Sequence, residues 1–375
     1  MTDPGRPPRA VVVGVGMIGR VHINALRRNG IEVVSVVAST PARSSEVAGE
    51  FRVPRGDPDL ASALAGADPD VVHICVPNHQ HYTMASAALA AGKHVVCEKP
   101  LTMLPAEAAD LRTRAAEAGV VNAICFNNRF YPLVQEMAAR QRSGSLGSVF
   151  AVRASIVDDS LWADSDTDWR LDPTIGGPSI VATTTGSHLI DLTSFILGER
   201  VAAVCADFHT AYPARRAAAA GPGGEEIANL MVRYESGARG ALSMSHMAVG
   251  HPYRLAVEID AAESGAGWNS ERPNELLIGH RGHPNEIVTP DPREASEAAR
   301  GFFENPGAYR EGFSETFRLL FREIYRDVGR APAERGEPTY PTFAAGQAGL
   351  IVHDAIMRSV RDARWSEVDW AALDG

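Results

Sequence analysis

The chain has 375 residues, of which 45% are hydrophobic and 22% charged, and its formal net charge is −10. An intrinsically disordered chain is excluded, because this hydrophobic fraction is typical of globular proteins and the net charge per residue is small. The acidic balance disfavours phosphate backbones as ligands, so we expect no nucleic-acid partner. No stretch approaches the ~18 uninterrupted apolar residues of a membrane helix, and no signal-type segment precedes Val11, so we expect no membrane association.

The length and the cysteines bound the organisation of the chain. A single hydrophobic core stops growing at about 250–300 residues, so we expect two domains. The four cysteines include no Cys-x-x-Cys pair, and three of them lie inside apolar, strand-like runs. We interpret them as small core residues in a reducing compartment, which predicts a cytoplasmic location.

Short apolar runs alternate with helical patterns over residues 1–126. The runs are Arg9–Val15, Ile31–Val37, Val71–Val76, His94–Cys97 and Val120–Phe126. The helical patterns are Ile18–Arg28, Ala42–Phe51, Thr83–Ala91 and Pro105–Ala118. This alternation predicts a doubly wound parallel sheet of the Rossmann type, because parallel strands need helical crossovers.

The pattern changes over residues 127–375, where consecutive strands follow one another and helices are scarcer. The expected strands are Ser148–Val157, Val201–Thr210, Ile227–Tyr234, Ala238–His246, Arg254–Ala261 and Glu275–Gly279. The expected helices are Pro132–Gln141, Ser187–Leu197, Tyr309–Val328 and Phe343–Val360, and we expect surface loops at Ala214–Gly224 and Gly282–Ala299. The pattern predicts an α+β domain with a largely antiparallel sheet, and the last helix is expected to pack back on the first domain.

The segment Gly14-Val15-Gly16-Met17-Ile18-Gly19 follows the first apolar run and opens a helical pattern, which is the context that a dinucleotide-binding loop requires. Gly14 permits the tight turn, Gly16 lets the backbone approach a pyrophosphate, and Gly19 lets helix and strand pack closely. Backbone N–H groups at the helix start, at Met17 and Ile18, then face the anion. A glycine-rich turn without a ligand is the alternative.

The second expected strand ends without an acidic residue. An NAD-binding protein usually carries an acid about 20 residues beyond the third glycine, but here that position is Ser39 and the next acid is Glu46. Ser39, Thr40 and Arg43 instead offer two hydroxyls and a guanidinium, the chemistry expected for the 2′-phosphate of NADP. We therefore prefer NADP over NAD, and the alternative is that Arg43 is a solvated helix residue.

The segment Glu98-Lys99-Pro100 follows the fourth run. Ligands of open parallel sheets bind beyond the carboxyl ends of the strands, so Lys99 is expected to face the nicotinamide end of a dinucleotide. It can act as a general acid and base if burial and the cofactor lower its pKa toward neutrality. A single solvated lysine at a strand end is the alternative.

These motifs, together with Pro77-Asn78-His79-Gln80-His81 and Gly186-Ser187-His188-Leu189-Ile190-Asp191, resemble those of the Gfo/Idh/MocA oxidoreductases. Asn128-Arg129-Phe130, Trp169-Arg170 and Pro341-Thr342-Phe343 are similar to further segments of that family. The resemblance implies a Rossmann domain that binds NAD(P), and a second domain whose open mixed sheet supports homodimers or homotetramers. It also implies hydride transfer between the nicotinamide and a secondary alcohol or ketone of a sugar, cyclitol or related polyol.

The resemblance further implies roles for single residues. Lys99 and His188 match the catalytic pair. Besides the glycine loop and the residues after the second strand, the cofactor-binding residues would be Pro77, Asn78, His81, Glu98 and Lys99. The substrate-binding residues would be Lys99, Arg129, Trp169, Thr184 and His188.

One position departs from the family pattern. Most members carry an aspartate four residues before the active-site histidine, where this chain has Thr184. A threonine accepts a hydrogen bond but contributes no charge to Lys99 or His188, so an altered substrate, slower chemistry or a silent protein would follow. Asp191 lies one helical turn beyond His188 and is expected to help the fold instead.

Metal and glycosidase chemistry are weaker alternatives. His79 and His81 lack a third ligand at a recognisable spacing, so we expect no metal site. An acidic loop follows the strand that ends at Val157, but its carboxylates have no known separation, so we expect it to be solvated or to line a polyol pocket with Trp162 or Trp169. Arg129 could contact a ligand or form an ordinary ion pair.

The leading hypothesis is an NADP-preferring oxidoreductase in which Lys99, assisted by His188, handles the hydroxyl proton. A regulator that binds a dinucleotide without redox chemistry is the first alternative, and Thr184 favours it. A lyase or hydrolase with a tightly bound, self-recycling NAD is the second.

Overall fold

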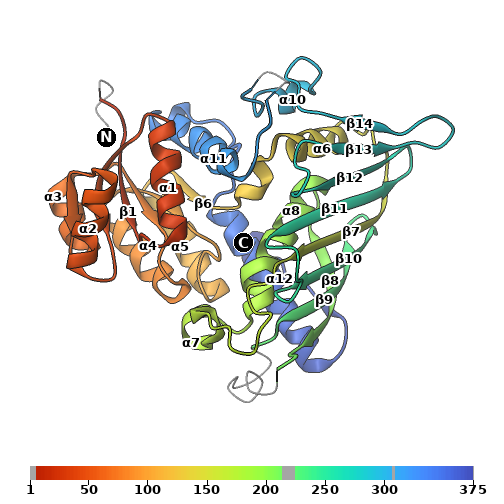
Figure 1. Cartoon of the computed structure of the whole chain (residues 1–375), viewed down its shortest axis with the longest axis horizontal. Helices are drawn as coiled ribbons and strands as arrows, with labels where there is room; N and C mark the ends of the chain where they lie inside the picture. Colours follow the sequence, from red (N-terminus) through yellow and green to blue (C-terminus); the bar gives the residue numbers. More distant parts are fainter. Residues whose placement is uncertain (1–5, 213–223, 306–308, 375) are drawn as a thin grey trace. The chain divides into compact units, whose positions relative to one another are not determined.

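The computed structural model describes residues 6–212, 224–305 and 309–374, which form two compact units (Figure 1). Unit 1 comprises Met1–Asn127 and Ser314–Ala348, and unit 2 comprises Asn128–Phe313 and Gly349–Gly375. The expected loop at Ala214–Gly224 lies outside the described residues except for Gly224.

Unit 1 is built on a six-stranded parallel sheet. Its strands are β1 (Arg9–Val13), β2 (Glu32–Val37), β3 (Arg55–Asp57), β4 (Val71–Ile74), β5 (His94–Cys97) and β6 (Asn122–Ile124). They lie in the order β3-β2-β1-β4-β5-β6, which reverses direction beside β1 as in a doubly wound sheet. This strand order confirms the predicted Rossmann fold. Apolar runs such as Val11–Val13 are buried, as expected for a parallel sheet that is covered on both faces.

The helices of unit 1 are the crossovers between these strands and two segments from the end of the chain. They are α1 (Met17–Arg28), α2 (Pro41–Phe51), α3 (Leu60–Ala67), α4 (His81–Ala90), α5 (Pro105–Glu117), α11 (Phe313–Val328) and the start of α12 (Phe343–Asp362). α11 contacts β4 through Tyr325, whose hydroxyl lies 2.9 Å from His73 Nε2. The main chain of Ile124 bonds Pro341 O at 2.9 Å, so the segment before α12 also joins this unit.

Sequence patterns missed two elements of unit 1. The edge strand β3 contains no large apolar side chain and is formed by main-chain pairing with β2. The short helix α3 begins at Asp59, whose carboxylate accepts the Ser62 N–H at 2.8 Å as an N-cap.

Unit 2 is built on a nine-stranded mixed sheet, in the order β14-β13-β12-β11-β7-β10-β9-β8-β15. Its strands are β7 (Val149–Val157), β8 (Val201–His209), β9 (Ile227–Tyr234), β10 (Arg239–Ser245), β11 (Arg254–Ala261), β12 (Gly265–Asn269), β13 (Leu276–Gly279), β14 (Glu286–Val288) and β15 (Ser366–Glu367). The central pair β7 and β10 is parallel and the other neighbours are antiparallel. The largely antiparallel sheet is therefore confirmed, but the expected loop Gly282–Ala299 contains β14, because its main chain pairs with β13.

Helices cover one face of this sheet (Figure 1). The helices of unit 2 are α6 (Pro132–Arg142), α7 (Pro173–Gly176), α8 (Ser187–Leu197), α10 (Glu297–Arg300), the remainder of α12 and α13 (Ala371–Asp374). The core lies between the sheet and α6, α8 and α12. Leu189, Ile196 and Ile356 are fully buried in it. The other face of the sheet is exposed along Arg153, Met231 and Leu277.

Candidate functional site

The glycine loop joins β1 to α1 at the carboxyl end of the parallel sheet. Gly14 has φ +87°, and a Cβ atom there would lie 2.3 Å from Cys75 O. A Cβ atom on Gly19 would lie 1.9 Å from Gly14 O. Both positions therefore exclude a side chain, and the loop packs tightly between α1 and the strand ends.

Gly16 differs from its two neighbours because its surroundings are open. A Cβ atom on Gly16 would meet no atom of the described residues within 4 Å. Gly16 is the N-cap residue of α1, and it provides no side-chain cap for the N–H groups of the first turn. An open backbone at an uncapped helix start is the arrangement that binds a pyrophosphate, so the residues present fit a dinucleotide.

The residues after β2 offer polar groups at the surface. Ser39 and Thr40 are exposed, and Thr40 Oγ1 accepts the Arg43 N–H at 3.2 Å as the N-cap of α2. The Arg43 guanidinium lies 2.6 Å from Glu46, and both side chains are solvent-exposed. Such an exposed pair contributes at most about 1 kcal/mol, so a phosphate can compete for Arg43.

The turn after β4 is anchored by His81, at the start of α4. His81 Nδ1 lies 2.7 Å from Pro100 O, and Nε2 lies 2.8 Å from Val76 O. The ring is 1% exposed, and burial lowers the pKa of His81 although both carbonyl oxygens oppose this. His81 therefore holds the backbone beside Lys99, and Pro77 and the buried Asn78 precede it in the same turn.

Glu98 and Lys99 follow β5 directly, and the bond between Lys99 and Pro100 is cis. Glu98 is 8% exposed, and its Oε2 accepts the Lys99 N–H at 3.2 Å. Burial alone would raise the pKa of Glu98, but the hydrogen bond from His22 and the charge of Lys99 hold it below its ordinary value. A carboxylate anion thus lies beside the half-buried Lys99.

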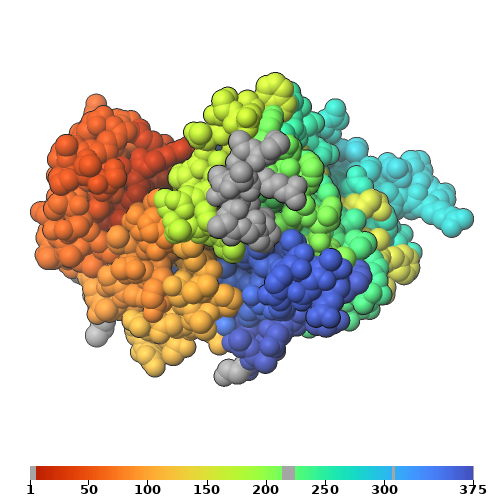
Figure 2. Space-filling model, turned by 90° about the horizontal axis from the view of Figure 1, so that it is seen from below, coloured from red at the N-terminus to blue at the C-terminus, as the bar shows by residue number. Residues whose placement is uncertain are grey.

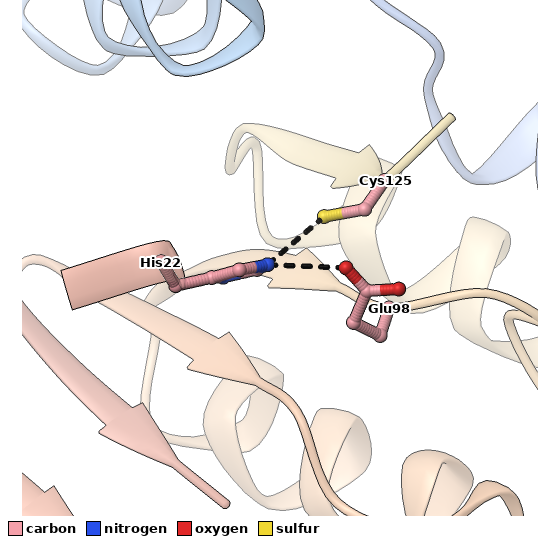
Figure 3. Close-up of side chains that lie close together, drawn as sticks. All are labelled: His22, Glu98 and Cys125. Carbon is pink, nitrogen blue, oxygen red and sulfur yellow. Dashed lines mark hydrogen bonds and ion pairs between the residues drawn. The ribbon is translucent and has the colours of Figure 1, made fainter. Parts of the chain in front are cut away.

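His22, Glu98 and Cys125 converge in the interior of unit 1 (Figure 3). His22 Nε2 lies 3.1 Å from Glu98 Oε1 and 3.7 Å from Cys125 Sγ. Their donor atoms could in principle hold a metal ion, but burial and the Glu98 charge raise the pKa of Cys125 well above its ordinary value. A neutral thiol is a poor ligand, so we assign these three residues to a hydrogen-bonded cluster. Sequence reasoning did not find His22.

In unit 2, His188 lies in the first turn of α8 and Thr184 in the π-helical turn Ala182–Gly186 that precedes it. Both side chains are half-buried. The turn is anchored at its start, where Glu225 accepts the Val181 N–H at 3.1 Å and the Ser179 hydroxyl. Thr183 Oγ1 also lies 3.1 Å from His353 Nε2. Such π turns recur at functional sites. The expected role of this segment in binding substrate stays a prediction.

Arg129 and Asp191 form a bidentate ion pair inside unit 2. Asp191 accepts from Arg129 Nε at 2.8 Å and from a terminal NH2 group at 2.5 Å. Burial raises the pKa of Asp191, although the Arg129 charge opposes this. Of the two possibilities left open for Arg129, the structure shows an ion pair, and Asp191 orients the guanidinium from α8.

Three carboxylates of the acidic loop after β7 have hydrogen-bond or ion-pair partners. Asp158 lies 2.9 Å from His246 Nδ1, Asp166 accepts the Ala163 N–H, and Asp168 binds Arg170. The Arg170 guanidinium lies 4.3 Å from the centre of the Trp169 ring, which is half-buried, whereas Trp162 is 55% exposed. His246 was not expected from the sequence, because it lies 88 positions from Asp158.

The two histidines considered for a metal site do not converge, since His79 is exposed while His81 is buried between carbonyls. Other possible ligands lie around the turn between β13 and β14, which projects from unit 2 (Figures 1 and 2). His280, His283 and Glu286 offer donor atoms within 4.8 Å of one another there. His283 and Glu286 are solvent-exposed, and exposed groups of this kind are common without an ion.

The parallel sheet with its open glycine loop defines a Rossmann-type dinucleotide-binding protein with an attached α+β domain. The family description "oxidoreductase family, NAD-binding Rossmann fold" matches residues 8–126, and the GFO/IDH/MocA C-terminal domain matches residues 134–263. The chain therefore belongs to the Gfo/Idh/MocA family of oxidoreductases, as its motifs predicted.

Two curated relatives match the chain over nearly its whole length. Levoglucosan dehydrogenase of Pseudarthrobacter phenanthrenivorans is 27% identical over 95% of this chain and 97% of its own. Inositol 2-dehydrogenase of Rhizobium meliloti is 26% identical over 94% of this chain and 97% of its own.

Solved structures match the fold. The inositol dehydrogenase homolog of Azotobacter vinelandii complexed with NAD+ superposes with a TM-score of 0.88 at 24% identity, over 98% of this chain and 100% of its own. Levoglucosan dehydrogenase in complex with NADH and levoglucosan gives a TM-score of 0.87 at 24% identity, over 97% and 100%. Within the described part of the chain, no helix combines the length and apolarity needed to cross a membrane.

Proposed function

We propose that this oxidoreductase transfers a hydride between a nicotinamide dinucleotide and a secondary alcohol or ketone of a sugar, cyclitol or related polyol. The observation that carries the proposal lies in unit 1, where the open start of α1 at Gly16 and the half-buried Lys99 both lie at the carboxyl ends of the parallel strands. This is the edge at which such sheets bind their ligands. The relatives named above act on levoglucosan and inositol, which supports a polyol substrate.

In this proposal the bound dinucleotide supplies or accepts the hydride. Lys99 Nζ takes up the hydroxyl proton when the alcohol is oxidised and returns it when the ketone is reduced. The neighbouring Glu98 carboxylate favours the ammonium form of Lys99, which is the form that donates. His188 assists with the same proton, and Arg129, Trp169 and Thr184 are proposed to bind the substrate.

The test compares two lysine variants, because the chain contains only Lys93 and Lys99. Polyols are screened for turnover with NAD(P)+, and keto-sugars with NAD(P)H. We expect Lys99→Met to lower turnover at least about 100-fold. Lys93→Met is the matched control, since Lys93 Nζ lies 3.5 Å from the exposed Asp68 and has no proposed role.

Each other outcome points to a different conclusion. Full turnover in Lys99→Met contradicts the role of Lys99. If the wild-type protein binds the dinucleotide but turns over no polyol, it is a regulator without redox chemistry. The uncharged Thr184 supports this second candidate function. A cofactor that survives desalting would indicate the self-recycling class.

We propose NADP as the preferred cofactor, supported by the exposed Ser39, Thr40 and Arg43 and by the absence of an acid at the end of β2. Titration with NADPH and NADH, followed by nicotinamide fluorescence, tests this. Arg43→Ala is expected to weaken NADPH about tenfold and to leave NADH unchanged, because only NADPH carries the 2′-phosphate. Glu46→Gln, which frees Arg43 from its ion pair, is expected to leave NADPH binding intact or tighter. Preference for NADH in the wild type would overturn the assignment.

We also propose a cytoplasmic homodimer or homotetramer. The exposed face of the unit 2 sheet carries a row of residues in register across eight strands, which includes Met231, Leu277 and Ile287. These three side chains are 54%, 41% and 56% exposed, and such apolar groups favour association. The four free cysteines support a reducing compartment.

A further inference from the structure

Four polar side chains from distant parts of unit 1 form one continuous hydrogen-bonded chain that ends beside Lys99. Glu98 Oε1 lies 3.1 Å from His22 Nε2, His22 Nδ1 lies 3.0 Å from His73 Nδ1, and His73 Nε2 lies 2.9 Å from the Tyr325 hydroxyl. Glu98 follows β5, His22 belongs to α1, His73 to β4 and Tyr325 to α11. The proposed chemistry uses none of the last three residues.

Aromatic rings isolate this chain from water. His22 and His73 are both 0% exposed, and Tyr325 is 7% exposed. The Phe321 ring lies 4.8 Å from each imidazole, and the Phe317 ring lies 5.5 Å from His22. A buried polar group without a hydrogen-bond partner destabilises the folded state. The hydrogen bonds to its neighbours therefore fix the orientation of each side chain in this series.

The protons of the chain can be placed from the carboxylate outward. Because Glu98 is ionised, it accepts from His22 Nε2–H. With its ring proton on Nε2, His22 offers Nδ1 as the acceptor that faces His73. His73 must donate to that atom from Nδ1–H, which leaves its Nε2 to accept the Tyr325 O–H. Burial and the neighbouring His22 hold the pKa of His73 well below its ordinary value, and burial raises the pKa of Tyr325 well above its own. His73 is therefore neutral, Tyr325 keeps its proton, and all three hydrogen bonds point toward Glu98.

Both oxygens of the carboxylate are thereby engaged. Oε1 accepts from His22, and Oε2 accepts the main-chain N–H of Lys99. These two contacts fix the carboxylate of Glu98, the residue next to Lys99 in the chain. The Lys99 amine is the group proposed to carry the substrate proton. We propose that His22, His73 and Tyr325 are positioning residues that hold Glu98 as the fixed counter-charge of Lys99, an inference that rests on the proposed function.

The other titratable groups around Glu98 and the chain do not compete for this role. They are Cys75, Cys97, Cys125 and His81 around Glu98, and Asp70 near Tyr325. Burial, with the Glu98 charge, raises the pKa of all three thiols well above the ordinary value, so they are neutral. Burial also lowers the pKa of His81, and both of its nitrogens contact main-chain carbonyls. Glu98 and Lys99 are thus the charged pair at this site.

The presence of only two lysines allows a direct measurement. Reductive methylation with ¹³C-formaldehyde labels Lys93, Lys99 and the terminal amine of the full-length protein while keeping their charges, and ¹³C NMR follows each titration. Glu98→Gln removes the anion without changing the shape, and we expect it to lower the Lys99 midpoint by about one pH unit. His22→Phe is expected to shift the midpoint in the same direction, because it removes the donor that keeps Glu98 ionised. Tyr325→Phe, an isosteric change at the far end, is expected to give a smaller shift of the same sign.

Two controls separate this role from simple packing. Lys93 is the internal reference and should titrate identically in every variant. Phe321→Leu loosens the ring packing around both histidines without removing a hydrogen bond, and it should leave the Lys99 midpoint unchanged. For variants that turn over substrate, the pH profile of kcat should move with the Lys99 midpoint. In His22→Phe and Tyr325→Phe the dinucleotide Kd should not change.

The results distinguish this inference from the proposed function. A Lys99 midpoint that moves in Glu98→Gln but stays unchanged in His22→Phe and Tyr325→Phe would overturn the positioning chain. An equal shift in Phe321→Leu would also overturn it, because packing would then explain the effect. Failure of the wild type to turn over any polyol would reject the proposed function alone, since the lysine titration needs no substrate.

Discussion

Glu225 illustrates how burial changes the chemistry of a single carboxyl group. Its side chain is 0% exposed, and its Oε1 accepts the Val181 N–H and the Ser179 hydroxyl at the start of the π turn before α8. Burial raises the pKa of Glu225 to about 7, although these hydrogen bonds oppose the shift. Between the ordinary value of 4.5 and about 7, the Glu225 carboxyl therefore keeps its proton in the folded protein and has lost it in the unfolded chain.

This proton predicts how stability depends on pH. Between the ordinary value of 4.5 and about 7, the native state binds more protons at Glu225 than the unfolded state, so the contribution of Glu225 to the free energy of unfolding falls as the pH rises. The loss above pH 7 is up to about 3 kcal/mol. Glu225→Gln mimics the neutral acid, so we expect it to be about as stable as the wild type at pH 5 and more stable at pH 8.

Urea unfolding at the two pH values measures this difference. Glu117→Gln is the matched control, because it makes the same substitution at an exposed position. A stability difference between Glu225→Gln and the wild type that does not change with pH would show that Glu225 is not the titrating group.

Arg129 shows the limit of prediction at the scale of one residue. Its sequence context allowed either a ligand contact or an ion pair. The structure pairs it with Asp191, 62 positions away, and places its guanidinium carbon 4.9 Å from the centre of the Phe195 ring. No local pattern encodes such a contact, because it depends on how η2 (Asn127–Phe130) packs against α8.

At the scale of elements, the glycine loop allows a prediction that separates folding from binding. A Cβ atom on Gly19 would lie 1.9 Å from Gly14 O, whereas one on Gly16 would meet nothing within 4 Å. Gly19→Ala must shift the backbone, so we expect it to lower the free energy of unfolding by about 1–3 kcal/mol. Gly16→Ala should change stability by less than about 1 kcal/mol but weaken dinucleotide binding about tenfold or more, because its methyl group occupies the space of the pyrophosphate.

Chemical unfolding and a fluorescence titration with NADPH and NADH, carried out on both variants, check this. Wild-type affinity in Gly16→Ala would mean that the dinucleotide does not approach the backbone there.

The strands that sequence patterns predicted in unit 1 are mainly those with buried apolar runs. β1, β2, β4 and β5 have strand interiors made of valine, isoleucine and similar residues. β3, β12 and β14 escaped prediction, because they are short edge or glycine-rich strands formed by main-chain pairing. Their existence depends on the neighbouring strand and not on their own side chains.

At the scale of the whole molecule, the exposed face of the unit 2 sheet predicts self-association. Met231, Ala241, Arg153 and Glu258 follow one another in register from β9 through β10 and β7 to β11. Arg153 pairs with Glu258 at 3.1 Å in the middle of this face. We expect Met231→Lys to shift the homo-oligomer toward smaller species, because a charge would be buried at the contact.

Size-exclusion chromatography with light scattering measures this effect. Leu104→Lys is the control, since it places the same charge at a 57% exposed apolar residue of unit 1. An unchanged mass in Met231→Lys, or a monomeric wild type, would reject this face as the interface.

The sequence by itself determined the parallel sheet of unit 1 and the glycine loop that follows its first strand. Each of these follows from short-range patterns, in which apolar runs, glycine spacing and helix starts impose local geometry. Only the tertiary structure decided which side chains act together. His22, His73 and Tyr325 join Glu98 across separations of 51 to 252 residues, and Glu225 reaches Val181 over 44 residues. Such contacts arise where packed elements exclude water and leave each buried polar group a single available partner, which no local periodicity can specify.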